Sequence, residues 1–135
     1  MSAFLFHVDP PTVADEGDEH GIQVRLLNRL RMVAPRLRIL AIPNQGQRSA
    51  YGNIRMKAEG LHKGTWDLLA MADGELAWAE LKTRTGQLKP EQIDFGNWLV
   101  NNGFRGGVFR SVDTAERWFR SLWPHLFTVP ESEAA

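Results

Sequence analysis

Two carboxylates and a lysine are brought together by their spacing in the sequence. Residues 66–72 and 75–82 form two apolar runs separated by an Asp-Gly pair, which is typical of a two-residue β-hairpin turn. In this hairpin the numbers of paired residues sum to 147, so Asp67 lies directly opposite Glu80. Lys82 follows Glu80 by two residues and shares its face, because side chains alternate along a strand. We therefore expect Asp67, Glu80 and Lys82 to lie close together.

Such a group of side chains suits metal-assisted hydrolysis. Two carboxylates that face each other on a sheet repel, and a bound cation relieves that repulsion. Oxygen ligands favour Mg²⁺ or Mn²⁺, and a lysine beside such an ion can hold or deprotonate a water and contact a phosphoryl oxygen. The set therefore indicates phosphodiester hydrolysis. The alternative is that these residues are only the polar side of an edge hairpin, with no metal.

Two further polar residues are expected on the same side of the fold. Glu19 lies near the apolar stripe of a helix expected over residues 18–34, at its N-terminal end. The alternative for Glu19 is a favourable interaction with the helix dipole, with Asp18 as the cap. Gln92 lies in the first turn of a helix that begins at Pro90, on the face expected to meet the sheet. Its neutral amide could hold a water or a phosphate there.

The elements that must position these residues follow from periodicity and from turn and cap residues. After the first helix, the sequence predicts a strand over 37–43, a polar segment over 44–65 with at most one short helix near 50–59, the hairpin, a helix from 90 to 101 or 102, a strand over 104–110, and a last helix capped by Ser111 or Asp113 and ended by Pro124. We interpret residues 18–124 as one α/β domain. Residues 1–17 are interpreted as a flexible arm, and residues 125–135 as a tail.

Composition excludes several classes of protein. The 135 residues include no cysteine, which excludes disulfides, thiolate zinc sites and cysteine nucleophiles and is compatible with the reducing cytosol. No apolar stretch approaches the roughly 20 residues of a membrane helix, and the histidine spacing predicts no zinc site. The sequence has no G-x-S-x-G motif, which argues against a serine hydrolase, and no phosphate-binding G-x-x-x-x-G-K-(S/T) motif, which argues against a nucleotide-driven motor and a nucleotide cofactor. We expect four tryptophans to fill the core: Trp78, Trp98, Trp118 and Trp123.

Charge is balanced overall, with 16 basic and 16 acidic residues, but it is unevenly distributed. Residues 25–63 contain nine Lys or Arg and a single Glu. This block could face a polyanion, although the solvated faces of ordinary helices are the alternative. Such contacts would be salt-dependent and blind to base sequence. The residues expected to contact phosphate groups of such a polyanion are Asn44, Arg48, Arg55, Lys57, His62 and Lys63.

Five motifs occur in one order along residues 19–113. They are Glu19 to Gln23 in the first helix, the loop sequences IPNQGQRS at 42–49 and KAEGL at 57–61, the tetrapeptide TWDL at 65–68, the triplet ELK at 80–82, and GQLKPEQ at 86–92. Together they resemble the PD-(D/E)XK nuclease superfamily. More narrowly, they resemble its virus-type replication-repair nuclease branch, VRR-NUC, in the small stand-alone form of phages and prophages. Trp66 stands where this family usually has Pro, and Lys89 stands where Ser is expected as a helix cap.

The resemblance implies a restriction-endonuclease-like αβββαβ core, with a central mixed sheet flanked by helices. It implies that Asp67, Glu80 and the Leu81 carbonyl bind Mg²⁺ or Mn²⁺. Lys82 would position or activate the attacking water. Trp66 could change how DNA or metal approaches, although neither departure from the family pattern removes a metal ligand.

The same resemblance assigns supporting roles to two residues and indicates a function. Glu19 would support the metal site or complete a second one, and Gln92 would orient water or Lys82. We expect a metal-dependent DNA endonuclease of the bacterial or phage-infected cytoplasm, acting as a homodimer. Its expected substrate is branched DNA, such as a four-way junction, in phage replication, recombination or repair. The alternatives are a non-catalytic nucleic-acid-binding domain on the same fold, and a restriction or host-takeover nuclease with sequence preference.

Overall fold

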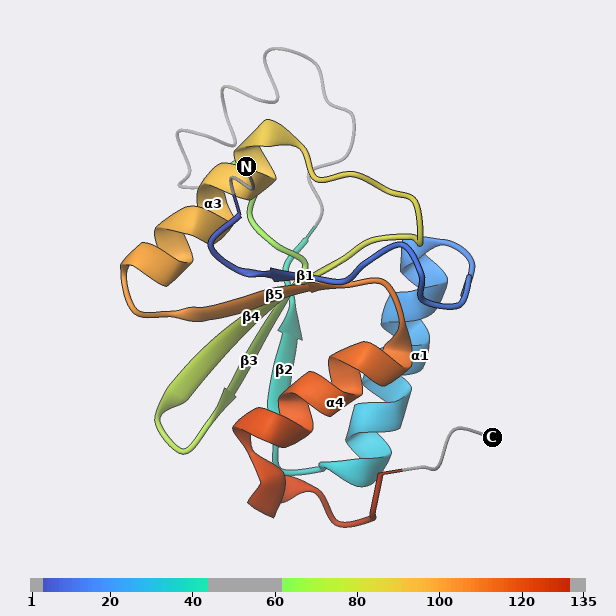
Figure 1. The fold of residues 1–135 in the computed structure, drawn as a ribbon. Helices are drawn as coiled ribbons and strands as arrows, with labels where there is room; N and C mark the ends of the chain where they lie inside the picture. Colours follow the sequence, from blue (N-terminus) through green and yellow to red (C-terminus); the bar gives the residue numbers. More distant parts are fainter. Residues whose placement is uncertain (1–3, 44–61, 132–135) are drawn as a thin grey trace.

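The chain folds as an α/β protein whose mixed sheet is flanked by helices (Figure 1). The computed structural model describes residues 4–43 and 62–131. In these ranges the elements are β1 (His7–Val8), α1 (Glu19–Val33), β2 (Arg38–Ala41), β3 (Leu68–Ala72), β4 (Glu75–Leu81), α3 (Pro90–Asn101), β5 (Arg105–Phe109), α4 (Val112–Leu122) and the 3₁₀ turn η1 (Pro124–Leu126). The order predicted for residues 18–124 is confirmed from α1 to α4. The short helix expected near 50–59 lies outside the described residues.

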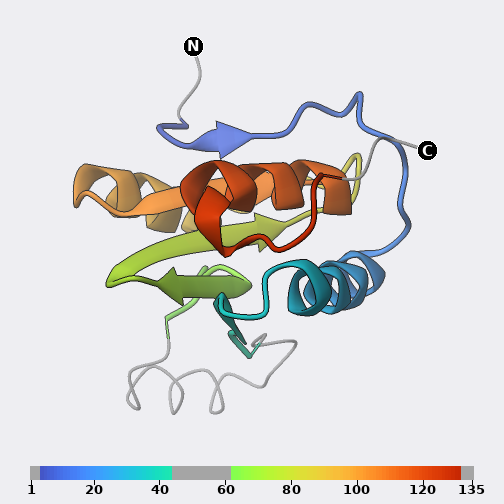
Figure 2. The same ribbon diagram turned by 90° about the horizontal axis from the view of Figure 1, so that it is seen from below.

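Five strands form the sheet in the order β1-β5-β4-β3-β2, and Figure 2 shows them following one another across it. β2, β3 and β4 pair antiparallel, whereas β4, β5 and β1 pair parallel. The β3–β4 hairpin turns at Asp73 and Gly74, whose φ angles are 53° and 78°. Both angles are positive, as a type I′ turn requires. Leu68 pairs with Ala79, so the predicted register is confirmed.

One face of the sheet packs against α1 and α4. This core is built by residues at helical spacing and by alternate strand residues: Ile22, Leu26, Leu30 and Val33 of α1, Ala77, Ala79 and Leu81 of β4, Phe109 of β5, and Ala115 and Phe119 of α4. Asp18 caps α1 by accepting a hydrogen bond from the Gly21 N–H at 2.7 Å. The cap and the apolar stripe together fix the end of α1 that carries Glu19.

The opposite face of the sheet packs against α3. Its smaller core contains Phe6, Trp66, Leu99 and Val108. The Trp66 ring comes so close to α3 that a methyl group on Gly96 would lie 2.4 Å from it. Glycine at this position therefore allows the indole to pack against the helix backbone.

Both ends of the described chain differ from the sequence prediction. Residues before 18 were expected to form a flexible arm, but β1 pairs with β5 and Phe6 is buried in the second core. The expected tail begins inside η1, where Leu126 is buried, and the Thr128 N–H donates to the Val33 carbonyl at 2.8 Å. These contacts join residues far apart in the sequence, so local composition did not reveal them.

The tryptophan predictions are only partly correct. Trp123 is fully buried, and Trp78 and Trp118 pack against the two cores. Trp98 is 53% exposed and stacks on Phe104, because the inward face of α3 is formed by its neighbours. In the described part of the chain, no helix is long and apolar enough to cross a membrane.

Candidate active site

Asp67 and Glu80 face each other at the open end of the β3–β4 hairpin. Each carboxylate accepts a hydrogen bond from the other strand's backbone. Glu80 Oε1 accepts from the Asp67 N–H at 3.0 Å, and Asp67 Oδ2 accepts from the Leu81 N–H at 2.9 Å. These two side-chain bonds join the strands beyond the last backbone pair, Leu68 with Ala79, and hold both carboxylates on the face predicted from the register.

Glu19 adds a third carboxylate from the first turn of α1. One oxygen atom each from Glu19, Asp67 and Glu80 lie within 4.8 Å of one another. Asp18 is the helix cap, as the alternative for this region proposed, yet Glu19 also reaches the acidic pair. The structure therefore brings together the three carboxylates that the sequence singled out.

Gln92 joins the cluster from the first turn of α3. Its side-chain oxygen accepts a hydrogen bond from the Lys89 N–H at 2.9 Å, as in a capping box. Its amide nitrogen donates to Glu80 Oε2, also at 2.9 Å. The first bond fixes which end of the amide faces Glu80, and the helix start thereby orients that carboxylate. Lys89 replaces the expected Ser without loss of this bond, because its backbone is the donor.

Lys82 is buried next to the carboxylates. Only 5% of this lysine is exposed, and its ammonium lies 3.6 Å from Glu80 Oε2. Its backbone N–H donates to the Phe109 carbonyl at 3.0 Å, which extends the β4–β5 pairing. A buried lysine beside three carboxylates supplies one positive charge against as many as three negative charges.

All three carboxyl groups of this cluster have raised pKa values. Burial, together with the Asp67 charge, raises the pKa of Glu80 to about 8, although Lys82 opposes the shift. Burial also raises the pKa of Asp67, against the hydrogen bond from the Leu81 N–H. Burial raises the pKa of Glu19, while Lys82 opposes it. The surroundings of all three carboxyl groups disfavour the ionised form unless further positive charge is supplied.

A divalent cation fits the donor atoms of this cluster. Three carboxylates supply only oxygen ligands, which suit Mg²⁺ or Mn²⁺. A cation bound among Glu19, Asp67 and Glu80 would offset both the mutual repulsion and the cost of burying the charges. In the described structure Leu81 contributes its N–H to Asp67, and its carbonyl stays a predicted ligand.

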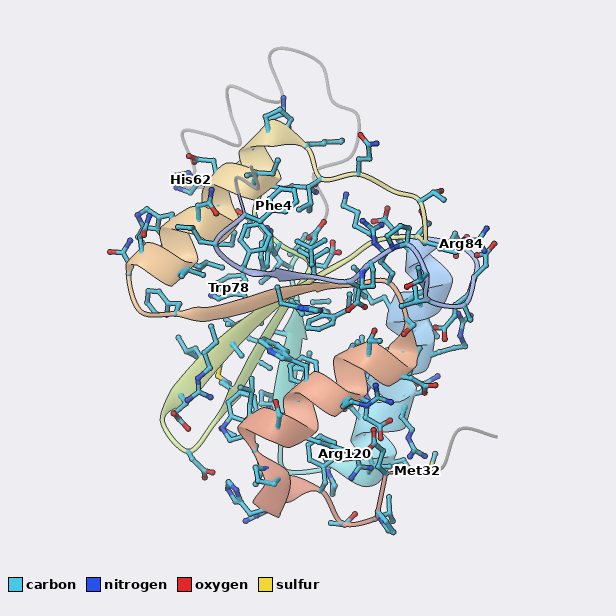
Figure 3. The ribbon with its side chains drawn as sticks, in the orientation of Figure 1. Phe4, Met32, His62, Trp78, Arg84 and Arg120 are labelled. Carbon is cyan, nitrogen blue, oxygen red and sulfur yellow. The ribbon has the colours of Figure 1, made fainter. Side chains whose placement is uncertain are left out.

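The residues predicted to contact DNA are mostly outside the described part of the chain. Asn44, Arg48, Arg55 and Lys57 fall within residues 44–61. Lys63 is described and exposed, and its ammonium lies 3.8 Å from Glu91 at the start of α3. His62 is also exposed, and Figure 3 shows it beside α3. These two residues stay predicted phosphate contacts.

Trp66 is a site-supporting residue whose role the sequence did not reveal. The sequence left open that it changes how DNA or metal approaches; in the structure its side chain is fully buried. Its indole N–H donates to the Gln92 carbonyl at 3.0 Å. Trp66 therefore joins the segment that carries Asp67 to the helix turn that carries Gln92. The signal in the sequence was the bulky aromatic residue next to the candidate metal ligand.

Comparison of the whole chain with protein-family models, with curated protein sequences and with solved structures finds no match in any of the three.

Proposed function

We propose that the chain is a metal-dependent endonuclease that hydrolyses phosphodiester bonds in DNA. One observation carries the proposal: Glu19, Asp67 and Glu80 can share a cation, while Lys82 and Gln92 both approach Glu80 Oε2. Three carboxylate ligands leave positions on a divalent ion for water and for a phosphate oxygen. The adjacent buried ammonium is then suited to the attacking water or to the phosphate.

Each residue of the site has a separate role in the proposed reaction. A bound Mg²⁺ or Mn²⁺ lowers the pKa of a ligated water and offsets the negative charge that develops on the phosphate. Lys82 holds the attacking water or a non-bridging phosphate oxygen. Gln92 holds the Glu80 carboxylate in place through Oε2, because its own amide is fixed by the Lys89 N–H, and Glu80 would be one of the ligands of the cation. Asp67 and Glu19 complete the set of carboxylate ligands.

We also propose that the fold is the restriction-endonuclease-like αβββαβ core. The order α1, β2, β3, β4, α3, β5 supports this assignment, as does a sheet that combines an antiparallel hairpin with a parallel strand. The candidate site is at the open end of that hairpin. The motifs that resemble VRR-NUC nucleases favour branched DNA as the substrate. Two copies of the chain would be needed to cut both strands at one time, since each copy carries one such site among its described residues.

The test is cleavage of DNA by the wild type and by two site variants. Matched duplex, single-stranded, flap and four-way-junction DNA are incubated with Mg²⁺ or Mn²⁺, and products are resolved on denaturing gels. We expect the wild type to cut, with the junction cut fastest. Lys82→Ala and Asp67→Asn each lower the single-turnover rate by at least about 10²-fold.

Glu75→Gln is the matched control, because Glu75 lies on the same strand as Glu80 but is exposed and pairs with Arg105 at the turn end. It should cut at the wild-type rate. If a well-folded wild type binds these DNAs and cuts none with either metal, the nuclease proposal is wrong and the non-catalytic binding domain is favoured. Fast cutting of plain duplex at one sequence would instead favour the restriction-type alternative.

A further inference from the structure

The turn that follows Lys82 is held by one buried arginine. Arg110 lies just after β5, and its Nη1 donates to the carbonyls of Thr83 and Gly86 at 2.7 and 2.6 Å. The turn is closed by its own hydrogen bond, from the Gly86 N–H to the Thr83 carbonyl at 3.2 Å. One guanidinium nitrogen thus binds both ends of a four-residue turn.

This turn lies against the side chain of Lys82. A methyl group on Gly86 would be 3.6 Å from Lys82 Cδ, which is ordinary van der Waals contact. Because glycine lacks that methyl group, the Gly86 backbone lies beside the lysine stem, and a methyl group would just fill the space between them. The lysine has three long rotatable side-chain bonds beyond Cβ, and in the described structure its ammonium has one ion-pair neighbour, Glu80. The turn thus occupies space beside the stem that the flexible side chain could otherwise enter.

Arg110 is itself fixed by the segment that precedes the predicted domain. Its Nε donates to the Asp9 carbonyl, and its backbone N–H donates to Asp9 Oδ2, both at 2.9 Å. The same carboxylate oxygen accepts from the Thr114 hydroxyl at 2.5 Å, and His7 Nε2 lies 2.7 Å from Asp9 Oδ1. Asp9 is only 4% exposed. Asp9, directly after β1, is thus the anchor that holds the guanidinium toward the turn.

We propose that Arg110, anchored by Asp9, is a positioning residue for Lys82. It acts through the Thr83–Gly86 turn and does not touch the carboxylates. A planar guanidinium is needed because it binds Asp9 with one nitrogen and the two turn carbonyls with another, which a shorter or single-headed side chain cannot do. The catalytic consequence rests on the proposed nuclease function, but the positioning of Lys82 does not.

The test measures the accessibility of Lys82 directly. Wild type and Arg110→Gln are treated briefly with an amine-reactive acetylating reagent, and modification of each lysine is quantified by mass spectrometry. Lys63 and Lys89 are exposed and serve as internal references. We expect Lys82 to be protected in the wild type. In Arg110→Gln its modification, relative to the references, rises by about tenfold, because the turn no longer holds the lysine stem.

Arg120→Gln is the matched control. Arg120 is also a mostly buried arginine, whose Nε donates to Glu116 Oε2 at 2.9 Å and whose Nη1 donates to the Val129 carbonyl at 2.8 Å. Figure 3 shows it at the opposite end of the molecule from Arg84, which is in the turn after Lys82. Its loss should lower thermal stability to a comparable degree and leave Lys82 protected. If Arg110→Gln does not fold, Asp9→Asn replaces it, with an expected increase of about threefold.

Kinetics provide the second readout. If the wild type cuts DNA, Arg110→Gln lowers kcat by about tenfold while KM stays within about twofold, because the positioning of a catalytic group and not substrate binding is lost. The proposal is overturned if Lys82 in the folded variant is modified at the wild-type rate, or if Arg120→Gln exposes it equally. A wild type that cuts no DNA would overturn the nuclease proposal alone, since the modification rates still decide the role of Arg110.

Discussion

Glu80 and Glu116 are both buried carboxylates, but their neighbours carry opposite charges. Glu116 lies between two arginines, with Arg29 Nε at 2.8 Å and Arg120 Nε at 2.9 Å. Burial would raise the pKa of Glu116, but the hydrogen bonds from the two arginines outweigh it and lower the pKa. Glu80 faces Asp67 instead, and its pKa is raised to about 8.

The difference shows that burial alone does not decide the state of a carboxylate. In the Glu116 cluster two arginines compensate the one carboxylate, and the contact with Arg29 joins α1 to α4. The Glu80 cluster holds three carboxylates and one nearby ammonium, so it has a remaining demand for positive charge. The first arrangement serves stability. The second costs stability in the metal-free fold, and a bound cation would offset that cost.

The largest expected difference between the clusters is in catalysis. Glu80→Gln removes a proposed ligand of the cation, so we expect the single-turnover cleavage rate to fall by at least about 10²-fold. Glu116→Gln leaves the site intact, and its folded fraction should cut within about threefold of the wild-type rate. Both are measured at a temperature where circular dichroism shows the variants folded. Equal losses in both would mean that the two clusters do not differ in function.

The next difference is in stability, and its sign depends on pH. Above pH 4.5 the ionised Glu116 stabilises the fold, and this contribution is lost as pH falls through its lowered pKa. Glu116→Gln should therefore cost about 2 kcal/mol at pH 7, with a smaller deficit below pH 4.5. The raised pKa of Glu80 has the opposite effect: metal-free protein loses stability as pH rises from 4.5 to about 8.

Glu80→Gln should consequently be more stable than the metal-free wild type, by an amount that grows with pH up to about 8. The growth is at most about 1.4 kcal/mol per pH unit. Urea unfolding in the presence of EDTA, at half-unit pH steps, measures both variants against the wild type. A Glu80→Gln variant that is less stable than wild type at pH 8 would contradict the assignment of unrelieved charge to this cluster.

The smallest expected effect is stabilisation by the metal itself. Mn²⁺ at ten times its Kd should add about 1.4 kcal/mol of stability, or roughly 5 °C in Tm for a chain of this size. The gain should disappear in Glu80→Gln and persist in Glu116→Gln. Thermal melts monitored by circular dichroism, with and without Mn²⁺, measure it. A similar gain in all three proteins would indicate that the ion binds elsewhere.

The local parts of the site were predictable from the sequence. The Asp-Gly turn fixes the hairpin register within a few residues, so the facing of Asp67 and Glu80 follows from strand alternation alone. The direction of Gln92 toward the sheet was predictable too, since its helix begins at a proline, whereas its hydrogen-bond partner Glu80 was not predicted. Turn chemistry and helical spacing act over short distances, and the sequence displays both.

The predictions that were wrong concern regions held by contacts between segments distant in the sequence. The first 17 residues contain two adjacent prolines, three acidic residues and Gly17, which is typical of a flexible arm. Asp9 is nevertheless buried and accepts hydrogen bonds from Arg110. No pattern in the sequence indicates that these two residues pair. Trp66 likewise finds its hydrogen-bond partner on α3, 26 residues away. The hydrogen bonds that brace the site are therefore less predictable than its reacting groups.

The acidic pair and the contacts that position Lys82 also differ in how many residues separate the groups that must come together. The hydrogen bond between the Asp67 N–H and Glu80 spans 13 residues, whereas the bonds from Arg110 to Asp9 span 101. Closing the longer loop costs about 1.8 kcal/mol more chain entropy. The acidic pair is consequently a product of the hairpin, and the alignment of Lys82 is a product of nearly the whole fold. Fraying of β1 from β5 would disturb the lysine while the carboxylates remained in place.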